Sequence, residues 1–320
     1  MDLSIVIVNW NTRELLAACL ASLPEAVRPY QTEVWVVDNG STDASAAMVR
    51  ERFPQAYVIA NQGNHGFARA NNQAMAQAAG RYWLLLNSDT VAPPGSLARL
   101  VQTLDEDVRI GIAGAQLLNE DGSAQNSIAP TPSLLTELGN KGLLRLVAPH
   151  RYATRLPHAD GPVDVDSVIG ACMMVRAAMA KEIGLLDEGY FFFLEETDWC
   201  VRAHAGGWRV VCDPRARVYH LQGRSAGKAR AEARIEYWRS RYRFFSRHRS
   251  GPSNVVLRVG LLAKLAGSIA VNALAAPTSP RHRQRLGIYR KIARWHRAGR
   301  PADWGLAIPP SQRDNRDEHG

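Results

Sequence analysis

The chain has 320 residues, and its balance of 46% hydrophobic to 22% charged residues is that of a globular protein. Four widely spaced cysteines form no Cys-x-x-Cys pair, and strand-like sequence follows Met1 directly. We therefore expect reduced thiols, no cleavable signal and a cytoplasmic location. From Arg224 onward lie 21 of the 39 basic residues and 6 of the 30 acidic ones, so this part carries a formal charge of +15 and residues 1–223 carry −6.

This charge asymmetry indicates two parts with different partners. An acidic body followed by a basic, aromatic-rich tail is typical of an enzyme held at an anionic surface. That surface could be a membrane or a nucleic acid, and charge alone does not decide between them.

Short apolar runs alternate with helical periodicity through the first 90 residues. Four runs predict strands: Leu3–Val8, Val34–Val37, Tyr57–Ala60 and the run that begins at Tyr82. Helices are expected between them at 13–23, through Val49, and in an alanine-rich stretch that ends at Ala79 before Gly80. Such alternation favours a parallel α/β sheet whose strands all deliver polar loops to one edge.

The run from Tyr82 stops at Asn87-Ser88-Asp89, which places Asp89 at the rim where open α/β sheets bind ligands. A carboxylate there can hold a divalent metal together with substrate phosphates. No Gly-x-Gly-x-x-Gly opens the first helix, so a metal would neutralise a diphosphate in place of a backbone cradle. The alternative is that this tripeptide only caps the next helix.

Asp38 follows the second predicted strand in Asp38-Asn-Gly-Ser-Thr-Asp43. A carboxylate at this position can accept hydrogen bonds from a ribose or a base, although it could also be a turn residue. The first half of the chain therefore resembles a nucleoside diphosphate site more than a hydride-transfer site.

The second half carries fewer regular elements. We expect a helix at Leu97–Leu104 and strands at Ile110–Leu118, Val165–Arg176 and Arg209–Cys212. A hairpin turn is expected at residues 119–122. The stretch from Gln125 to Pro162 is interrupted by prolines and glycines, and it predicts a mobile loop region that could form an acceptor entrance or plain surface.

Three consecutive phenylalanines, 191–193, lead into the acids Glu195, Glu196 and Asp198. Acids in the first turn of a helix are favoured by its dipole, so they could act only as caps. Acids against aromatic bulk are also what a general base needs, because partial desolvation raises a carboxylate's pKa toward working pH. His220, at a predicted strand end, could be a further metal ligand or a structural residue.

Six short motifs occur in order along residues 3–225: Val-Asn-Trp-Asn at 8–11, Val-Asp-Asn-Gly-Ser-Thr-Asp at 37–43, Asn-His-Gly-Phe-Ala-Arg-Ala-Asn-Asn at 64–72, Leu-Asn-Ser-Asp at 86–89, Glu-Glu-Thr-Asp-Trp-Cys-Val-Arg at 195–202 and His-Leu-Gln-Gly-Arg-Ser at 220–225. In this series the chain resembles the inverting glycosyltransferases of family 2, especially their bacterial rhamnosyltransferase-like branch. The resemblance implies a GT-A fold, a Rossmann-like and mostly parallel sheet flanked by helices, over residues 1–225. Residues 1–118 would form the nucleotide-sugar half and 119–225 the acceptor half.

The resemblance also implies roles for individual residues. Those holding the nucleotide would be Asn9, Asn11, Asp38, Gly66, Phe67, Asn71 and Ser88. A divalent metal, Mg²⁺ or Mn²⁺, would be bound by Asp89 and His220, and Glu196 would be the general base, with Glu195 and Asp198 as alternatives. The sequence departs from the family pattern twice: Asn87 stands where a first metal-binding aspartate is frequent, and Glu196 where the base is commonly aspartate.

The implied reaction is transfer of a sugar, with inversion, from a nucleoside diphosphate donor to a saccharide or lipid-linked acceptor in cell-surface polysaccharide synthesis. The branch favours dTDP-rhamnose, with UDP-sugars as the other choice. A nucleotidyltransferase on a related fold would need a basic, glycine-rich first loop, which Asn9-Trp-Asn-Thr12 does not supply. A non-catalytic protein that binds polyanions or nucleic acid is disfavoured by the acidic first 223 residues, and no recognised nucleic-acid module occurs.

Residues 226–320 predict a basic, membrane-associating helical extension. Residues 232–249 place Ile235, Trp238, Tyr242 and Phe245 on one stripe, and residues 281–300 do the same with Ile288, Ile292 and Trp295. The stretch 255–276 is long enough to span a bilayer, but a central Lys264 costs roughly 2.5–3.5 kcal/mol there. We expect residues 226–300 to lie on the anionic inner face of a cell membrane, with no nucleic-acid partner; the alternative is that these helices pack on the catalytic domain.

Overall fold

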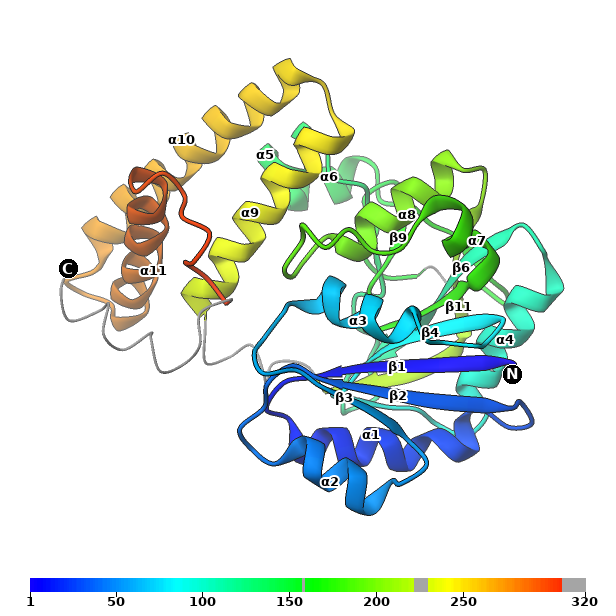
Figure 1. The fold of residues 1–320 in the computed structure, drawn as a ribbon. Helices are drawn as coiled ribbons and strands as arrows, with labels where there is room; N and C mark the ends of the chain where they lie inside the picture. The colour runs from blue at the N-terminus through cyan, green and yellow to red at the C-terminus, as the bar shows by residue number, and fades with distance from the viewer. Residues whose placement is uncertain (157–158, 222–229, 307–320) are drawn as a thin grey trace.

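A computed structural model of the chain describes residues 1–156, 159–221 and 230–306. Figure 1 shows a mixed sheet with helices on both faces, and a group of three long helices beside it. The strands are β1 (Leu3–Asn9), β2 (Thr32–Asp38), β3 (Tyr57–Ala60), β4 (Tyr82–Asn87), β5 (Thr90–Val91), β6 (Ile110–Leu118), β7 (Ile128–Ala129), β8 (Val163–Asp164), β9 (Ser167–Val168), β10 (Cys172–Arg176) and β11 (Arg209–His220). The helices are α1 (Arg13–Ala26), α2 (Ser45–Arg52), α3 (Phe67–Met75), α4 (Ser96–Glu106), α5 (Leu134–Leu138), α6 (Lys141–Val147), α7 (Ala177–Ile183), α8 (Glu195–Ala205), α9 (Arg230–His248), α10 (Gly251–Ala275) and α11 (Pro280–Arg297).

The main sheet has the order β3-β2-β1-β4-β10-β6-β11-β5. Strands β3, β2, β1 and β4 are parallel, as predicted, and β10 is inserted antiparallel between β4 and β6. Strands β6 and β11 are parallel again. Because β1, β2 and β4 run the same way, the polar loops that follow them meet at one edge of the sheet.

Both faces of the sheet are buried, which explains the continuous apolar runs. Ile5 and Ile7 of β1 point into a core shared with α1 and α4. Val6 points into the opposite core, which contains α3 and the buried Trp199 of α8. The same alternation fixes the register of each central strand, since a shift by one residue would exchange the two faces.

The structure corrects several predicted elements in the second half. The stretch from Gln125 to Pro162 contains β7, α5 and α6 instead of a continuous mobile loop. The strand predicted at Val165–Arg176 is divided into β9 and β10, and the one predicted at Arg209–Cys212 continues as β11 to His220. In the first half, α3 ends at Met75 rather than Ala79. The hairpin turn at residues 119–122 is confirmed, with the Asn119 amide donating to the Ser123 carbonyl.

The helices α9, α10 and α11, here called the extension, have a core of their own. It contains the side chains that were predicted to face a membrane, Ile235, Trp238, Tyr242, Phe245, Ile292 and Trp295, so this prediction was wrong for α9 and α11. Their stripes pack against each other and against Tyr190 of the sheet-bearing part. The predicted boundary at residue 225 and the last residues of the 220–225 motif lie outside the described residues.

Ion pairs attach the extension to the sheet-bearing part. Asp187 accepts hydrogen bonds from Arg243 and Arg247, and Asp198 accepts one from His248 (2.6 Å to Nε2). In Figure 1 the long helix α10 lies on the outer side of the extension, away from the strands. Within the described ranges, α10 is the one helix long and apolar enough to cross a membrane, and 17% of its most apolar stretch is buried.

Candidate functional site

A cavity of about 530 Å³ opens at the carboxyl ends of β1, β2 and β4. Its wall includes five predicted site residues, Gly66, Phe67, Ser88, Asp89 and His220. We call it the strand-end cavity. The remaining wall residues are Val8, Trp10, Thr12, Asn39, Asn64, Asn87, Phe191, Phe192, Phe193, Ala233 and Leu306.

Asp89 and His220 face each other in this wall, with Asp89 Oδ1 3.3 Å from His220 Nε2. Gln125 holds the imidazole from behind: its Nε2 donates to the His220 carbonyl (2.6 Å), which leaves its Oε1 to accept from His220 Nδ1 (3.2 Å). A proton on Nδ1 makes Nε2 a lone-pair donor aimed at the carboxylate. Two electron-pair donors at this separation fit a shared cation, and a partner on the other ring nitrogen is what orients metal-binding histidines.

The donor set of one carboxylate and one imidazole suits Mg²⁺ or Mn²⁺ only if further oxygens join it. No group of three or more His, Cys, Asp or Glu side chains that could hold a metal occurs among the described residues. A substrate diphosphate and water would therefore complete the coordination, which is the usual arrangement for magnesium. Asn87, in the position of the missing aspartate, contacts His220 Nε2 through its amide (3.4 Å).

Asn9 and Asp38 lie buried behind the wall. Asn9 Nδ2 donates to Asp38 Oδ1 (3.0 Å), and Thr12 Oγ1 connects Asn9 Oδ1 (2.6 Å) to Ser88 Oγ (2.9 Å). The second oxygen of Asp38 accepts from the Ser41 amide (3.1 Å). This network positions the β1, β2 and β4 loops relative to one another. A direct contact of Asp38 with a nucleoside stays a prediction.

Asn11 and Asn71 also lie outside the cavity wall. Asn11 has a left-handed backbone (φ 54°), and its Oδ1 accepts from the Thr42 amide (2.8 Å), which fixes the loop after β2. Asn71 is buried; its Nδ2 donates to the Phe67 carbonyl (2.9 Å) and its Oδ1 has no partner within the described ranges.

Gly66 has a conformation that other residues rarely adopt, with φ 83°. A Cβ at this position would lie 2.5 Å from the Phe191 carbonyl oxygen. The next amide, that of Phe67, donates to the same oxygen (2.8 Å). Glycine therefore lets the aromatic segment 191–193 close against the start of α3 and form one side of the cavity.

The three acids at the start of α8 differ in their surroundings. Asp198 is fully buried, with Oδ2 accepting from Arg202 (2.8 Å) and Oδ1 from His248 (2.6 Å). Burial alone would raise its pKa, but these hydrogen bonds hold the pKa of Asp198 below its usual value. Oδ2 is thus engaged within α8 and Oδ1 joins α8 to α9, a structural role rather than that of a base.

Glu195 and Glu196 have the opposite electrostatics. Burial raises the pKa of Glu196 to about 7. Burial and, next, the charge of Glu196 raise the pKa of Glu195 well above its usual range. A Cβ on Gly170 would lie 3.6 Å from Glu196 Cγ and 3.8 Å from Phe67 Cε1, so Glu196 and the wall residue Phe67 both border Gly170. A carboxylate that titrates near neutrality next to a cavity has the properties of a general base.

Several residues of the site were not predicted. Gln125, which holds His220, lies in the stretch expected to be a mobile loop, and no local pattern distinguishes it. Ala233 and Leu306 come from the extension, where only tertiary packing brings them to the cavity. Asn64 could have been found, because it opens one of the six motifs and its Oδ1 accepts from the Gly66 amide (2.9 Å).

Comparison with known proteins gives consistent matches. The family described as Glycosyl transferase family 2 matches residues 4–184. The chain is 30% identical to the N-acetylglucosaminyl-diphospho-decaprenol L-rhamnosyltransferase of Mycobacterium tuberculosis, over 82% of this chain and 90% of that protein. It is 27% identical to the low-salt glycan biosynthesis hexosyltransferase Agl10 of Haloferax volcanii, over 63% and 61% of the two chains.

Among solved structures, the mannosyltransferase PcManGT from Pyrobaculum calidifontis, in complex with GDP-Man and Mn²⁺, superimposes with a TM-score of 0.54. The match covers 91% of this chain and 85% of that one at 15% identity, so it supports the fold alone.

Proposed function

The chain belongs to glycosyl transferase family 2, and we propose that it transfers a sugar, with inversion, from a nucleoside diphosphate donor to a lipid-linked saccharide. The observation that carries this proposal is the pairing of two features around one cavity. Asp89 and His220 face each other at 3.3 Å in its wall, and Glu196, with a pKa raised to about 7, borders Gly170 together with Phe67 of the same wall.

In the proposed reaction Glu196 accepts the proton of the acceptor hydroxyl. The freed oxygen attacks the anomeric carbon of the donor, and the bond from that carbon to the diphosphate breaks with its electron pair left on the diphosphate. Attack opposite the leaving group inverts the anomeric centre. The raised pKa of Glu195 favours its protonated form, which adds no second negative charge beside the base.

Asp89 and His220 would hold a divalent metal ion on the diphosphate side. When bound, such an ion supplies positive charge that stabilises the departing diphosphate. Gln125 Oε1 would accept a hydrogen bond from the protonated Nδ1 of His220, which leaves the lone pair of Nε2 available for the metal.

The nature of the substrates is inferred from the relatives. The Mycobacterium tuberculosis relative is named as an L-rhamnosyltransferase acting on an N-acetylglucosaminyl diphospholipid. We propose dTDP-rhamnose as donor, with UDP-sugars as the second choice, and a sugar diphospholipid as acceptor. The product would enter cell-surface polysaccharide synthesis.

A lipid-linked acceptor places the enzyme at a membrane, and α10 is the best candidate for that contact. One stripe of this helix, Leu257, Leu261 and Leu265, is buried in the extension. Its other sides expose Val255, Val256, Val259, Leu262, Val271 and Leu274. We propose that α10 lies in the cytoplasmic membrane interface through these side chains, because its packed stripe and Lys264 disfavour crossing the bilayer.

The variant Glu196→Gln tests the assignment of the base. Transfer of labelled sugar should fall at least about a hundredfold, the usual contribution of general base catalysis, while dTDP binding stays unchanged. For the wild type, kcat/KM should rise with pH and level off above about 7, since only the deprotonated base is active.

Glu195→Gln is the matched control because it makes the same change at the neighbouring buried acid. It should retain most of the activity. Full turnover by Glu196→Gln, or a greater loss in Glu195→Gln, would assign the base elsewhere.

A further inference from the structure

A second cavity, of about 610 Å³, lies within the extension. We call it the extension cavity. Its walls come from α5, α9, α10 and α11, and they carry three cations, Arg234, Arg241 and Lys264, against a single carboxylate, Glu137. The formal charge of this wall is therefore positive. The wall of the neighbouring strand-end cavity, in contrast, contains the acid Asp89. A hollow with this excess of cations is suited to an anion.

Arg241 is a charged group whose hydrogen bonding is incomplete. Its exposed fraction is 8%, and its Nε is a buried donor with no partner in the part of the chain that the structure describes. Its ion pair with Glu137 is long, at 3.5 Å. The guanidinium lies 4.7 Å from the ring centres of both Tyr237 and Trp238. A buried N–H donor without a hydrogen-bond partner costs free energy, and a phosphate oxygen that accepted this hydrogen bond would offset the cost. The planar guanidinium of arginine also matches the geometry of phosphate oxygens.

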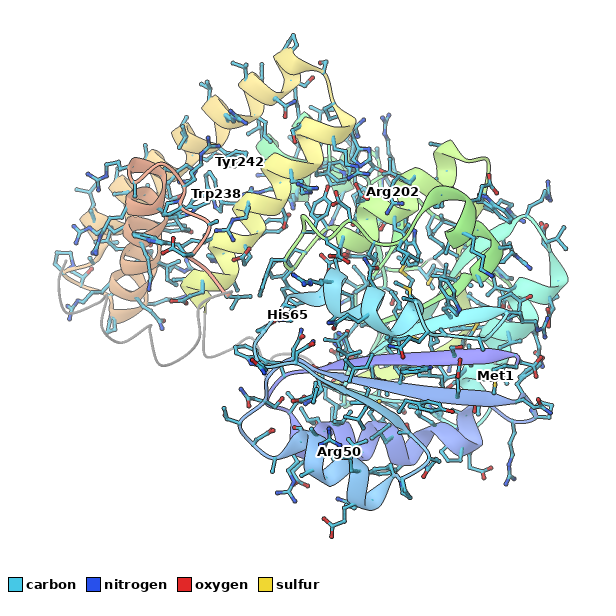
Figure 2. The ribbon with its side chains drawn as sticks, viewed as in Figure 1. Met1, Arg50, His65, Arg202, Trp238 and Tyr242 are labelled. Atoms are coloured by element: carbon cyan, nitrogen blue, oxygen red, sulfur yellow. The ribbon has the colours of Figure 1, made fainter. Side chains whose placement is uncertain are left out.

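The other two cations stand around the same hollow on different helices. Lys264 Nζ donates to the main-chain carbonyl of Glu137 (3.1 Å), a neutral group that does not cancel its charge. Arg234 is exposed and lies over the ring of Tyr289, 5.7 Å from its centre. Figure 2 shows Trp238 and Tyr242 on the side of α9 that faces α10 and α11, which is the side where the cavity lies.

The extension cavity adjoins the strand-end cavity, because Phe193 and Ala233 line both. Burial raises the pKa of Tyr237 to about 12, and the nearby carboxylates Glu137 and Glu196 add to this effect. Tyr237, in the wall of the extension cavity, is thus within electrostatic range of the proposed base. A ligand anchored in the extension cavity could present its next group to Glu196.

On its other side the extension cavity adjoins apolar surface. Leu261 and Leu265 of α10 form part of the wall, and the neighbouring Leu262 and Val259 are exposed on the outer sides of that helix. The molecule therefore offers a base, then a cationic hollow, then an apolar helix surface, in this order. A sugar, a diphosphate and a lipid chain follow one another in the same order in a sugar diphospholipid.

We propose that the extension cavity binds the diphosphate of the lipid-linked acceptor through Arg241, Lys264 and Arg234. A diphosphate diester carries one negative charge on each phosphate, which matches the excess of two cations in the wall. This inference rests on the proposed function for the position of the acceptor sugar, but it assigns a separate binding site to residues outside the catalytic cavity.

The test measures binding of the full chain to a polyprenyl diphosphate carried in uncharged phosphatidylcholine vesicles, with no donor present. Lys264→Gln and Arg241→Gln should each weaken this binding by about tenfold or more, as expected for loss of a charge-assisted hydrogen bond. Their binding of dTDP should stay within twofold of wild type. Arg285→Gln, which removes an exposed α11 cation outside the cavity wall, is the matched control and should change neither.

Equal losses in Lys264→Gln and Arg285→Gln would indicate a diffuse charge effect and overturn the proposal, as would no loss in Lys264→Gln and Arg241→Gln. Because Arg241 is buried, thermal unfolding of Arg241→Gln should be measured to check that this variant folds. If it does not fold, the binding of Lys264→Gln, which changes an exposed residue, decides the test. If inorganic diphosphate competes as strongly as the lipid does, the site serves a soluble anion and the lipid assignment is wrong.

These measurements need no turnover and therefore separate the two proposals. Loss of transfer in Glu196→Gln with intact lipid binding supports both. Tight, Lys264-dependent lipid binding by a protein that transfers no sugar would overturn the proposed reaction alone. Transfer to a soluble saccharide without lipid diphosphate binding would overturn only the present inference.

Discussion

The two neighbouring cavities are built in different ways. The strand-end cavity is made largely by residues on the loops that follow parallel strands and by the aromatic segment 191–193, and its imidazole is held by two hydrogen bonds with Gln125. The extension cavity is made by long side chains projecting from packed helices, and its central arginine is incompletely bonded. The strand-end cavity is suited to holding a reacting diphosphate in a fixed geometry. The extension cavity is suited to binding a charged group whose orientation can vary.

Replacing Asp89 by alanine should disable the strand-end cavity and leave the extension cavity intact. We expect sugar transfer to fall by about a thousandfold, because several kcal/mol of charge stabilisation would be lost. Calorimetric titration with UDP, dTDP and GDP, with and without Mn²⁺, should show metal-dependent binding of one nucleotide in the wild type and none in the variant. Lipid diphosphate binding should persist.

Asp121→Ala removes an acid from the exposed turn after β6 and serves as the control for that experiment. It should bind nucleotide normally. Metal-dependent binding that survives in Asp89→Ala would contradict the assignment of the metal ligand.

Replacing Asp198 by asparagine acts on the joint between the two regions. Its carboxylate is buried between Arg202 and His248, and removing the charge from such a group costs about 3–5 kcal/mol of unfolding free energy. Because the folded-state pKa of Asp198 is lowered, its contribution is complete above pH about 4 and is lost as pH falls. Denaturant unfolding at pH 7 and pH 3 should therefore show a difference from wild type that shrinks at the lower pH.

Glu14→Gln provides the comparison, since the Glu14–Arg13 pair is exposed (79% and 48%) and should be worth less than about 1 kcal/mol. Similar losses in both variants would contradict a special role for the buried joint.

The smallest expected effect concerns Gly305, in the segment 301–306 that returns from α11 to α9. Arg239 donates to the carbonyls of Pro301 and Trp304, and Leu306, whose amide donates to Glu236 (3.2 Å), reaches the strand-end cavity. A Cβ on Gly305 would lie 2.0 Å from Glu236 Oε1, so the variant Gly305→Ala must displace the segment 301–306. Nucleotide binding should weaken by about fivefold, close to 1 kcal/mol, in a calorimetric titration.

Gly299→Ala is its control, because Gly299 also has a positive φ (81°) but has open space around its Cβ position. It should bear the backbone strain without any loss of nucleotide binding. Equal weakening in both variants would mean that strain, and not the displaced wall, is responsible.

The sequence predicted the first half of the fold well for a physical reason. Strands β1, β2 and β4 are buried on both faces, so their apolar runs have one compatible environment, and the polar residues that end them must meet at one edge. This is why Asp89 was correctly placed at the rim, whereas Ser88 and Gly66 were assigned to the site only through the resemblance. His220 was a candidate ligand from its place at a predicted strand end, although the predicted strand stopped at Cys212 and its continuation to His220 was not foreseen.

The extension was harder to predict because a basic, aromatic stripe has the same pattern whether it faces lipid or another helix. The stripes of α9 and α11 pack against each other, and the exposed apolar surface of the extension belongs to α10. Likewise, the acids Glu195, Glu196 and Asp198 look alike in sequence, and the ion-paired acid is distinguished by Arg202 one helical turn away and by the distant His248.

Ala233 of α9 and Leu306, which follows α11, form part of the wall of the strand-end cavity, and this has a consequence for protein engineering. A shortened chain that ends before α9 would lose two wall residues of the strand-end cavity and the partners of Asp187, Asp198 and Tyr190. The extension is thus not a detachable module. Exchanging it between relatives would also exchange part of the wall of the strand-end cavity, so we expect chimeric proteins to differ in nucleotide binding.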